Sequence, residues 1–318
     1  MNKIREYIEN YNRIIIHGHV RPDGDCLGSQ YGLYYLIKDN YPNKEVYVTG
    51  TVSEYVSFVG RPELIDESLF EGALSICVDC ATQDRLSDTR CTLSKEFIKI
   101  DHHIPVDNYG DYQYVDTTAP ACAQIITELY LANKDDWKLS KEAASALYVG
   151  ILTDTGRYKF DSVNSRTFMA AATLVDAGVN LGDIDNKLSI ETLQTLKLKG
   201  YVLSNFKMSE NGFAYITLTR EEIESFGVSD EDAAAQVSTI SCIEGCPVWA
   251  IMLEYSKEEI RVRLRSRGPV INLLAEEYNG GGHAKASGAS LATWADLDDF
   301  VQKADKIVKD YKESLTIS

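Results

Sequence analysis

Residues 14–25 read IIIHGHVRPDGD, and this stretch decides the fold of the first part of the chain. Three consecutive isoleucines predict a strand buried on both faces, because such strands form short apolar runs rich in β-branched residues. Directly after this run the chain presents His19, Asp23 and Asp25. Proline and glycine residues between them bend the backbone, so the three side chains can converge on one point. The stretch therefore predicts a strand that ends in a cluster of polar groups.

Short apolar runs of the same kind recur further along the chain. They predict strands at 46–48, 74–78 and 97–100, with a helix over 27–37 after the first strand. Helical patterns then dominate, at 121–133, 141–152 and 165–177. Strands that alternate with helices predict an α/β fold, with a mostly parallel sheet and helices on both faces.

The length of 318 residues is enough for two domains that each bury a core. We predict a first domain at residues 1–186, a polar helical linker at 187–205 and a smaller C-terminal α/β domain at 206–318. Strand-like runs at 213–218, 248–253 and 260–264, followed by a helix at 297–311, indicate the second domain.

The composition limits the possible partners. With 48 acidic and 32 basic side chains the net charge is −16, which taken alone disfavours a protein that binds long nucleic acid. The sequence has no N-terminal signal pattern and no apolar run near the ~20 residues of a membrane helix. One C-x-x-C pair, Cys77 and Cys80, lacks a second pair at zinc-site spacing, so we expect reduced thiols. These features predict a cytoplasmic protein without a membrane partner.

All five histidines fall in short segments that already carry other polar residues; they are His17, His19, His102, His103 and His283. Two apolar strands end in polar groups as the first one does, one in Asp79 and the other in the run 101–103. A predicted helix gives way to a turn at Asp154. Because parallel strands place their carboxyl ends along one edge of a sheet, these groups are expected to share one crevice.

The expected cluster contains two imidazoles and four carboxylates: His19, His102, Asp23, Asp25, Asp79 and Asp154. Two divalent ions would use so many ligands, and the oxygen-rich set suits Mn²⁺ or Mg²⁺, with Fe²⁺ or Co²⁺ as further options. Two ions about 3.5–4 Å apart activate a water and stabilise a leaving oxygen in phosphoryl transfer. Any one of these aspartates alone could be a helix cap or turn residue, and His17 is interpreted as structural. Several strand ends together favour a shared metal site.

These motifs resemble those of the DHH phosphoesterases. The resemblance rests on HVRPDGD at 19–25, Asp79 at a strand end, DHH at 101–103 and TDTG at 153–156. Near the C-terminus, GGGHAKASG at 280–288 resembles the motif of the DHH-associated C-terminal domain. In length and layout the chain looks most like the standalone, RecJ-like subfamily of bifunctional nanoRNases (oligoribonucleases) and pAp phosphatases.

The resemblance implies roles for individual residues. The six clustered residues become metal ligands, with Asp79 bridging both ions. His103 would contact the scissile phosphate or protonate the leaving group, and Asp101 would orient the imidazoles. The family pattern has a polar residue after Asp79, but this chain has Cys80 there. The effect of this thiol on metal preference and on sensitivity to oxidation is left open.

The second domain carries a basic strand, EIRVRLRSRG at 259–268. Its alternation places Arg261, Arg263, Arg265 and Arg267 on one face, where like charges about 7 Å apart repel unless anions are near. Arg261 and Arg263 can equally form a solvated edge. The resemblance implies that Arg265 and Ser266 bind substrate.

The glycine run supplies backbone amides that can approach a phosphate, and the next histidine adds a donor. The predicted residues are Gly280, Gly281, Gly282 and His283. With the metals on the opposite wall, they would form an active site in the cleft between the two domains.

The expected function is a metal-dependent phosphoesterase, with two divalent ions, most simply Mn²⁺. It would hydrolyse short oligoribonucleotides to mononucleotides, convert 3′-phosphoadenosine 5′-phosphate (pAp) to AMP, or both. Alternatives are a phosphodiesterase for linear dinucleotides such as pApA from cyclic di-AMP turnover, a manganese-dependent inorganic pyrophosphatase and a catalytically silent nucleotide-binding protein. A long nucleic acid partner is disfavoured, and a homodimer is compatible with the sequence.

Overall fold

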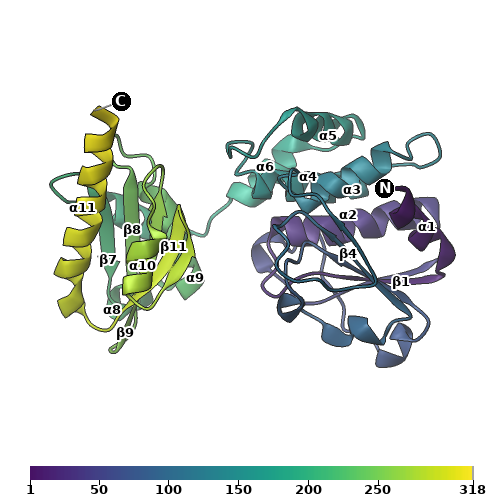
Figure 1. Cartoon of the computed structure of the whole chain (residues 1–318), viewed down its shortest axis with the longest axis horizontal. Coiled ribbons are helices and arrows are strands. Elements are labelled where there is room, and N and C mark those ends of the chain that lie inside the picture. The colour runs from purple at the N-terminus through teal and green to yellow at the C-terminus, as the bar shows by residue number, and fades with distance from the viewer. Residues whose placement is uncertain (317–318) are drawn as a thin grey trace. The chain divides into compact units, whose positions relative to one another are not determined.

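A computed structural model describes residues 1–316 of the chain (Figure 1). The chain divides into two compact units, Met1–Ile190 and the residues from Glu191 onward. Each unit has its own hydrophobic core, and each is described separately below.

The first unit is built on a parallel sheet of five strands. They are β1 (Arg13–His17), β2 (Glu45–Thr49), β3 (Leu74–Val78), β4 (Glu96–Asp101) and β5 (Tyr112–Val115), in the order β2-β1-β3-β4-β5. Ile16 of β1 pairs with Ile76 of β3, which pairs with Ile98 of β4, so the three central strands end at the same edge. This arrangement confirms the predicted α/β class and the parallel sheet; β5 was not predicted.

The α-helices of this unit are α1 (Asn2–Asn10), α2 (Gly24–Asn40), α3 (Cys122–Leu131), α4 (Lys141–Asp154), α5 (Ser165–Asp176) and α6 (Leu181–Ser189). Helices α1 to α6 contribute to the same large core on one face of the sheet. The other face is covered by loops and 3₁₀ turns, among them η2 (Glu67–Phe70), η3 (Gln83–Arg85) and η4 (Thr89–Leu93). The remaining turn, η1 (Glu54–Val56), joins the helix-side core through Val56. The expectation of α-helices on both faces is corrected here, because the β2–β3 and β3–β4 connections form only such short turns.

Helices α2 and α4 approach each other closely because glycines line their contact. A Cβ atom on Gly28 would lie 2.6 Å from the backbone oxygen of Ala146. A Cβ atom on Gly150 would lie 2.8 Å from Oδ1 of Asp25. These glycines therefore allow α4 to reach the helix that carries the first polar motif.

The second unit contains a mixed sheet of six strands in the order β10-β11-β9-β8-β7-β6. Its strands are β6 (Lys207–Met208), β7 (Phe213–Leu218), β8 (Val248–Ser256), β9 (Glu259–Ser266), β10 (Gly281–His283) and β11 (Ala286–Leu291). Its helices are α7 (Leu193–Asn205), α8 (Arg220–Phe226), α9 (Asp230–Ala235), η5 (Gln236–Ile240), α10 (Asn272–Glu277), η6 (Trp294–Asp296) and α11 (Leu297–Thr316).

Two cores lie on opposite faces of this sheet. Ile260, Val262 and Leu264 of β9 join the core that α10 and α11 cover. Trp249 and Ile251 of β8 join the other core, with residues of α7, α8, α9 and η5. Helix α7, which lies in the segment expected as a linker, contributes buried side chains to this second core.

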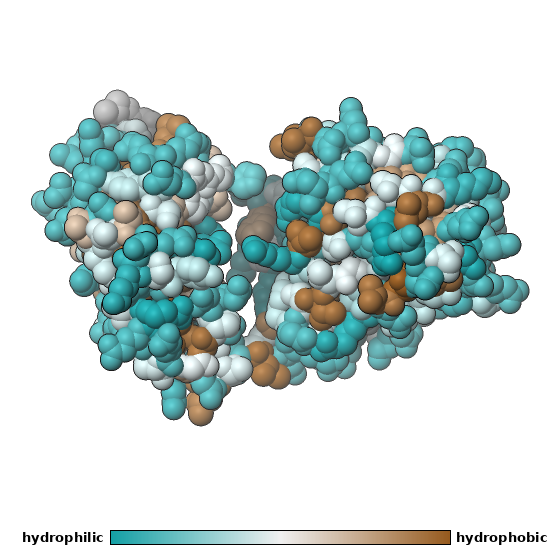
Figure 2. Space-filling model, turned by 90° about the horizontal axis from the view of Figure 1, so that it is seen from below, coloured by the Kyte–Doolittle hydropathy of each residue, from teal (hydrophilic) through white to brown (hydrophobic). Residues whose placement is uncertain are grey.

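Hydrophilic residues cover most of the surface visible in Figure 2, with apolar side chains in separate patches. No helix within residues 1–316 is long and apolar enough to cross a membrane.

Candidate active site and metal centre

The predicted site residues of the first unit lie together where the central strands end. His19 follows β1, Asp79 follows β3 directly, and His102 follows β4 directly. Asp154 is the last residue of α4. Asp79 has a φ angle of 56°, a left-handed conformation that turns its carboxylate out of the strand direction. The close contact of α2 and α4 completes the cluster.

The two imidazoles of the cluster present the same nitrogen atom to the carboxylates. Nδ1 of His19 donates to the backbone oxygen of Val20 at 2.8 Å, and Nδ1 of His102 donates to that of Ala119 at 3.2 Å. Nε2 of His19 then lies 3.6 Å from Oδ2 of Asp79. Backbone carbonyls thus fix the ring orientation and leave both Nε2 atoms available to a metal.

His102 stands at the centre of the carboxylates. Its Nε2 lies 3.3 Å from Oδ1 of Asp79, 3.4 Å from Oδ2 of Asp154 and 3.7 Å from Oδ2 of Asp25. Asp23 is further out: its Oδ2 is 3.9 Å from Nε2 of His19, while its Oδ1 caps α2. The structure therefore brings all six predicted ligands into one cluster.

Asp25 is held by the start of helix α3. Its carboxylate accepts the backbone N–H groups of Cys122, at 2.6 Å, and Ala123, at 2.9 Å, and the hydroxyl of Ser29 at 3.2 Å. A helix N-terminus stabilises a negative charge at this place. These hydrogen bonds from α3 join residues nearly a hundred positions apart in the chain, and they hold the fully buried carboxylate of Asp25 in place.

Crowding of like charges perturbs the protonation of the cluster. Burial, together with the charges of Asp79 and Asp154, raises the pKa of Asp25 well above its ordinary value. Burial and the neighbouring carboxylates raise the pKa of Asp154 to about 6. Burial opposes protonation of His102, but the close carboxylate of Asp79 and the charges of Asp25 and Asp154 outweigh it and raise the pKa of His102 to about 10. So many carboxylates in a buried cluster therefore favour a compensating positive charge beside them.

The arrangement fits divalent metal ions. Oδ1 of Asp79 is buried and meets no donor with hydrogen-bond geometry, which is costly for a carboxylate unless a cation is nearby. Three groups of side chains each bring ligand atoms within 4.8 Å of one another: His19 with Cys26 and Asp79, Asp79 with His102 and His103, and Asp25 with His102 and Asp154. Asp79 and His102 each occur in two of these groups, whereas Asp23 occurs in none of them.

A buried chain of charges supports His103. Nδ1 of His103 donates to Oδ1 of Asp101 at 2.8 Å, and the same oxygen accepts the backbone N–H of His102. On the other side, Nζ of Lys99 lies 3.1 Å from Oδ2 of Asp101, and both side chains are almost completely buried. Lys99 also donates to the backbone oxygen of Ala81. Asp101 is thereby fixed, and it orients the ring of His103.

The two remaining features of this site, Lys99 and Tyr55, were missed by sequence reasoning. Lys99 and Asp101 are two residues apart on one strand and so share a face, which is a signal that could have indicated the pair.

The hydroxyl of Tyr55 accepts the backbone N–H of Gly24, and burial and the charge of Asp23 raise the pKa of Tyr55 to about 12. Tyr55 and Thr153 line a pocket of about 350 Å³ beside the end of α4. No sequence pattern connects Tyr55 with this site.

His17 is fully buried behind the cluster. Its Nε2 lies 2.9 Å from Oγ of Ser75, and its ring packs against Phe70. Nδ1 has no hydrogen-bond partner. Burial lowers the pKa of His17 from 6.5 to about 4, so the folded protein keeps this ring neutral.

The stability of the protein should therefore depend on pH through His17. Between pH 6.5 and pH 4 the unfolded chain binds a proton at this ring that the folded chain does not, so stability is complete above pH 6.5 and falls below it. We expect wild type to lose about 2 kcal/mol more free energy of unfolding between pH 7 and pH 5 than His17→Gln. Urea unfolding at both pH values measures this difference. Equal losses in the two proteins would contradict the assignment.

In the second unit, the predicted substrate residues lie around one corner of the sheet. Arg265 of β9 is in register with Ala286 of β11, which is in register with His283 of β10, so the three share a face. The guanidinium of Arg265 is half-buried and donates to the backbone oxygen of Leu264. The Ser266 hydroxyl, by contrast, is buried and donates to the backbone oxygen of Pro269.

The glycine run has the backbone freedom that a phosphate loop needs. A Cβ atom on Gly280 would lie 2.0 Å from the backbone oxygen of Gly288, and Gly282 has a φ angle of 134°. A Cβ atom on Gly281 would meet nothing within 4 Å. Gly280 and Gly282 are thus required by the fold, whereas Gly281 faces open space.

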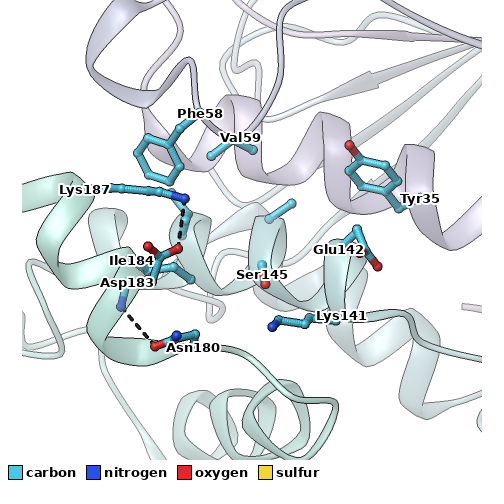
Figure 3. Close-up of a pocket in the computed structure, with 12 residues that line it drawn as sticks. Tyr35, Phe58, Val59, Lys141, Glu142, Ser145, Asn180, Asp183, Ile184 and Lys187 are labelled. Carbon is cyan, nitrogen blue, oxygen red and sulfur yellow. Dashed lines mark hydrogen bonds and ion pairs between the residues drawn. The ribbon is translucent and has the colours of Figure 1, made fainter.

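A different pocket, of about 330 Å³, lies between α2, α4, α6 and the loop that carries Phe58 (Figure 3). Tyr35, Lys141 and Lys187 are among the side chains around it, and Lys187 forms an ion pair with Asp183. None of the predicted site residues lines this pocket, so we assign it no part in the chemistry.

Comparison with known proteins identifies the family of both parts of the chain. Residues 13–151 match the DHH family, N-terminal domain, and residues 211–310 match the DHHA1 domain. The bifunctional oligoribonuclease and PAP phosphatase NrnA of Bacillus subtilis is 39% identical over 306 residues, which cover 96% of this chain and 97% of that protein. The chain belongs to the DHH family. Its resemblance to the DHH phosphoesterases of the oligoribonuclease and pAp phosphatase type is thereby confirmed.

Two further similar proteins extend the comparison. The probable bifunctional oligoribonuclease and PAP phosphatase NrnA of Streptococcus mutans is 39% identical and covers 95% of this chain and 97% of its own length. The crystal structure of an exopolyphosphatase-related protein from Bacteroides fragilis has a TM-score of 0.85 and 27% identity, covering 99% of this chain and 97% of that one. The predicted fold class is confirmed over both units.

Proposed function

We propose that this DHH protein is a metal-dependent phosphoesterase that hydrolyses short oligoribonucleotides to mononucleotides and converts pAp to AMP. The observation that carries the proposal is the buried carboxylate of Asp79. Its Oδ2 faces Nε2 of His19, and its Oδ1, which has no hydrogen-bond partner, faces Nε2 of His102. The names of the relatives, which are similar over nearly the full chain, support this choice of substrates.

We propose that His19, Asp23, Asp25, Asp79, His102 and Asp154 hold two divalent ions. Mn²⁺ is the preferred candidate because carboxylate oxygens dominate the ligand set and two imidazoles complete it. When bound, such ions lower the pKa of an attacking water and neutralise charge on the scissile phosphate. Substrate binding and proton transfer to the leaving oxygen are carried out by side chains of the protein.

His103 is positioned to move a proton. Its Nδ1–H is committed to Asp101, so its Nε2 is the nitrogen that remains for substrate, and 39% of its side chain is exposed. In the protonated ring, Nε2–H donates to the oxygen that leaves phosphorus, and Asp101 stabilises the positive charge. The His103 ring also packs against His102, with 4.4 Å between ring centroids, which fixes its distance from the cluster.

The second unit would bind the part of the substrate that is not cleaved. Arg265, His283 and the amides of the Gly280–Gly282 run offer donors to a phosphate, with a guanidinium as the charged group. Ser266 has a structural role in its turn, so its proposed effect on substrate would act through the backbone that carries Arg265.

A substrate panel tests the proposed function. Metal-reconstituted protein is offered pAp, pApA, 5′-phosphorylated RNA of three to five residues and inorganic pyrophosphate in parallel. We expect mononucleotides from the RNAs, AMP and phosphate from pAp, and no phosphate from pyrophosphate. Turnover of pApA alone would favour a dinucleotide phosphodiesterase, and turnover of pyrophosphate alone would contradict the proposal.

A further inference from the structure

Strand β9 and the residue that follows it carry four arginines at alternate positions, and three of them already have partners within the protein. Arg261 donates to Oε1 of Glu259 at 2.9 Å and stacks on the ring of Tyr255. Arg267 donates to the backbone oxygens of Ile243 and Cys246. Arg265 donates to a backbone oxygen as described above.

Arg263 differs from the other three. It is exposed, and within residues 1–316 its guanidinium has no hydrogen bond and no ion pair, although the chain contains 48 acidic residues. Its same-face neighbours along the strand are Arg261 and Arg265, and burial together with the charge of Arg263 lowers the pKa of Arg265. Two cations are therefore held side by side without a carboxylate between them, which is unfavourable unless an anion binds.

The surface beside Arg263 is open. Arg263 is in register with Gly288 of β11, which is in register with Gly281 of β10, so the neighbouring positions carry no side chain. A Cβ atom on Gly281 would meet nothing within 4 Å, and one on Gly288 would meet only a backbone oxygen at 3.7 Å. The guanidinium of Arg263 thus borders an open surface that is formed by the backbone of two glycines.

We infer that Arg263 binds a second phosphate of a single-stranded oligonucleotide, next to the phosphate that Arg265 and His283 bind. Alternate residues of a strand lie about 7 Å apart on one face, an interval that the flexible backbone of a single strand can match between adjacent phosphates. This inference rests on the proposed function and narrows its substrate class. pAp and pApA have two phosphates, of which one is cleaved, so Arg263 acts only on RNAs of three or more residues.

Steady-state kinetics on a length series test the inference. For Arg263→Gln we expect kcat/KM to fall about tenfold, mainly through KM, on RNAs of three to five residues, and less than twofold on pAp and pApA. Arg263→Lys should retain part of the higher activity on RNAs of three to five residues, because lysine keeps the positive charge. Lys257→Gln, which removes an exposed cation from the β8–β9 turn, is the matched control and should leave the length dependence unchanged.

Equal losses on all substrates, or no loss on any, would overturn the inference. Binding measured without hydrolysis separates it from the proposed function. With metal removed by EDTA, the affinity for a fluorescent five-residue RNA is followed against salt, and Arg263→Gln should reduce the slope of log K against log [salt] by about 0.7. If wild type cleaves no RNA, the proposed function fails; an unchanged slope shows that Arg263 binds no phosphate.

Discussion

Asp79→Asn is expected to lower kcat on pAp and on short RNA by at least about 10³-fold, because it removes the negative charge that both proposed metal ions would share. Asparagine is chosen because it tolerates the left-handed backbone conformation observed at this residue, so the strand end should keep its geometry. The substitution also removes the carboxylate that both His19 and His102 face.

The metal itself provides a second readout for this variant. A ligand that binds the folded state at a concentration of 100 Kd stabilises it by about 2.7 kcal/mol, so Mn²⁺ should raise the Tm of wild type by several degrees. Asp79→Asn should lose most of this shift while its metal-free Tm stays close to that of wild type. The control is Asp84→Asn, an exposed aspartate five residues further along. Near-native activity with a retained Mn²⁺ shift in Asp79→Asn would exclude the proposed site.

Lys99→Met is expected to destabilise the first unit by about 3 kcal/mol, because removing one partner of a buried ion pair leaves the other charge uncompensated. Lys99 and Asp101 are 1% and 0% exposed as side chains, so solvent cannot replace the lost partner. Burial opposes the charge on Asp101, and His103 and Lys99 outweigh it to keep its pKa below the ordinary value. Without Lys99 this carboxylate should protonate more readily and hold His103 less firmly.

A double-mutant cycle measures this coupling. The free energies of unfolding of Lys99→Met, Asp101→Asn and the double variant are measured with urea. We expect the loss in the double variant to be smaller than the sum of the two single losses by at least about 1 kcal/mol. Lys95→Met, the same substitution at an exposed position just before β4, should cost less than about 0.5 kcal/mol. We also expect kcat of Lys99→Met to fall about tenfold through misplacement of His103. Additive losses would show that the two charges are not coupled.

Local sequence determined the elements that carry the chemistry. The isoleucine run before His19, and the runs before Asp79 and Asp101, could only form buried strands. The parallel order of such strands then brings their ends to one edge. The motif pattern therefore predicted the ligand set, because each ligand lies within a few residues of an element end. It also placed Arg265 and His283 in the second domain by their motif alone.

Tertiary structure decided what joins these elements. The contact of Tyr55 with Gly24 and that of the α3 amides with Asp25 join distant parts of the chain, and no local pattern records such distances. The lack of a partner for Arg263 was also decided by the tertiary structure. The alternation along β9 predicted the face on which Arg263 lies. Only the packed structure shows that the three other arginines have partners and that Arg263 has none among residues 1–316. Periodicity reports the direction of a side chain, whereas its partners depend on which distant segments the core brings together.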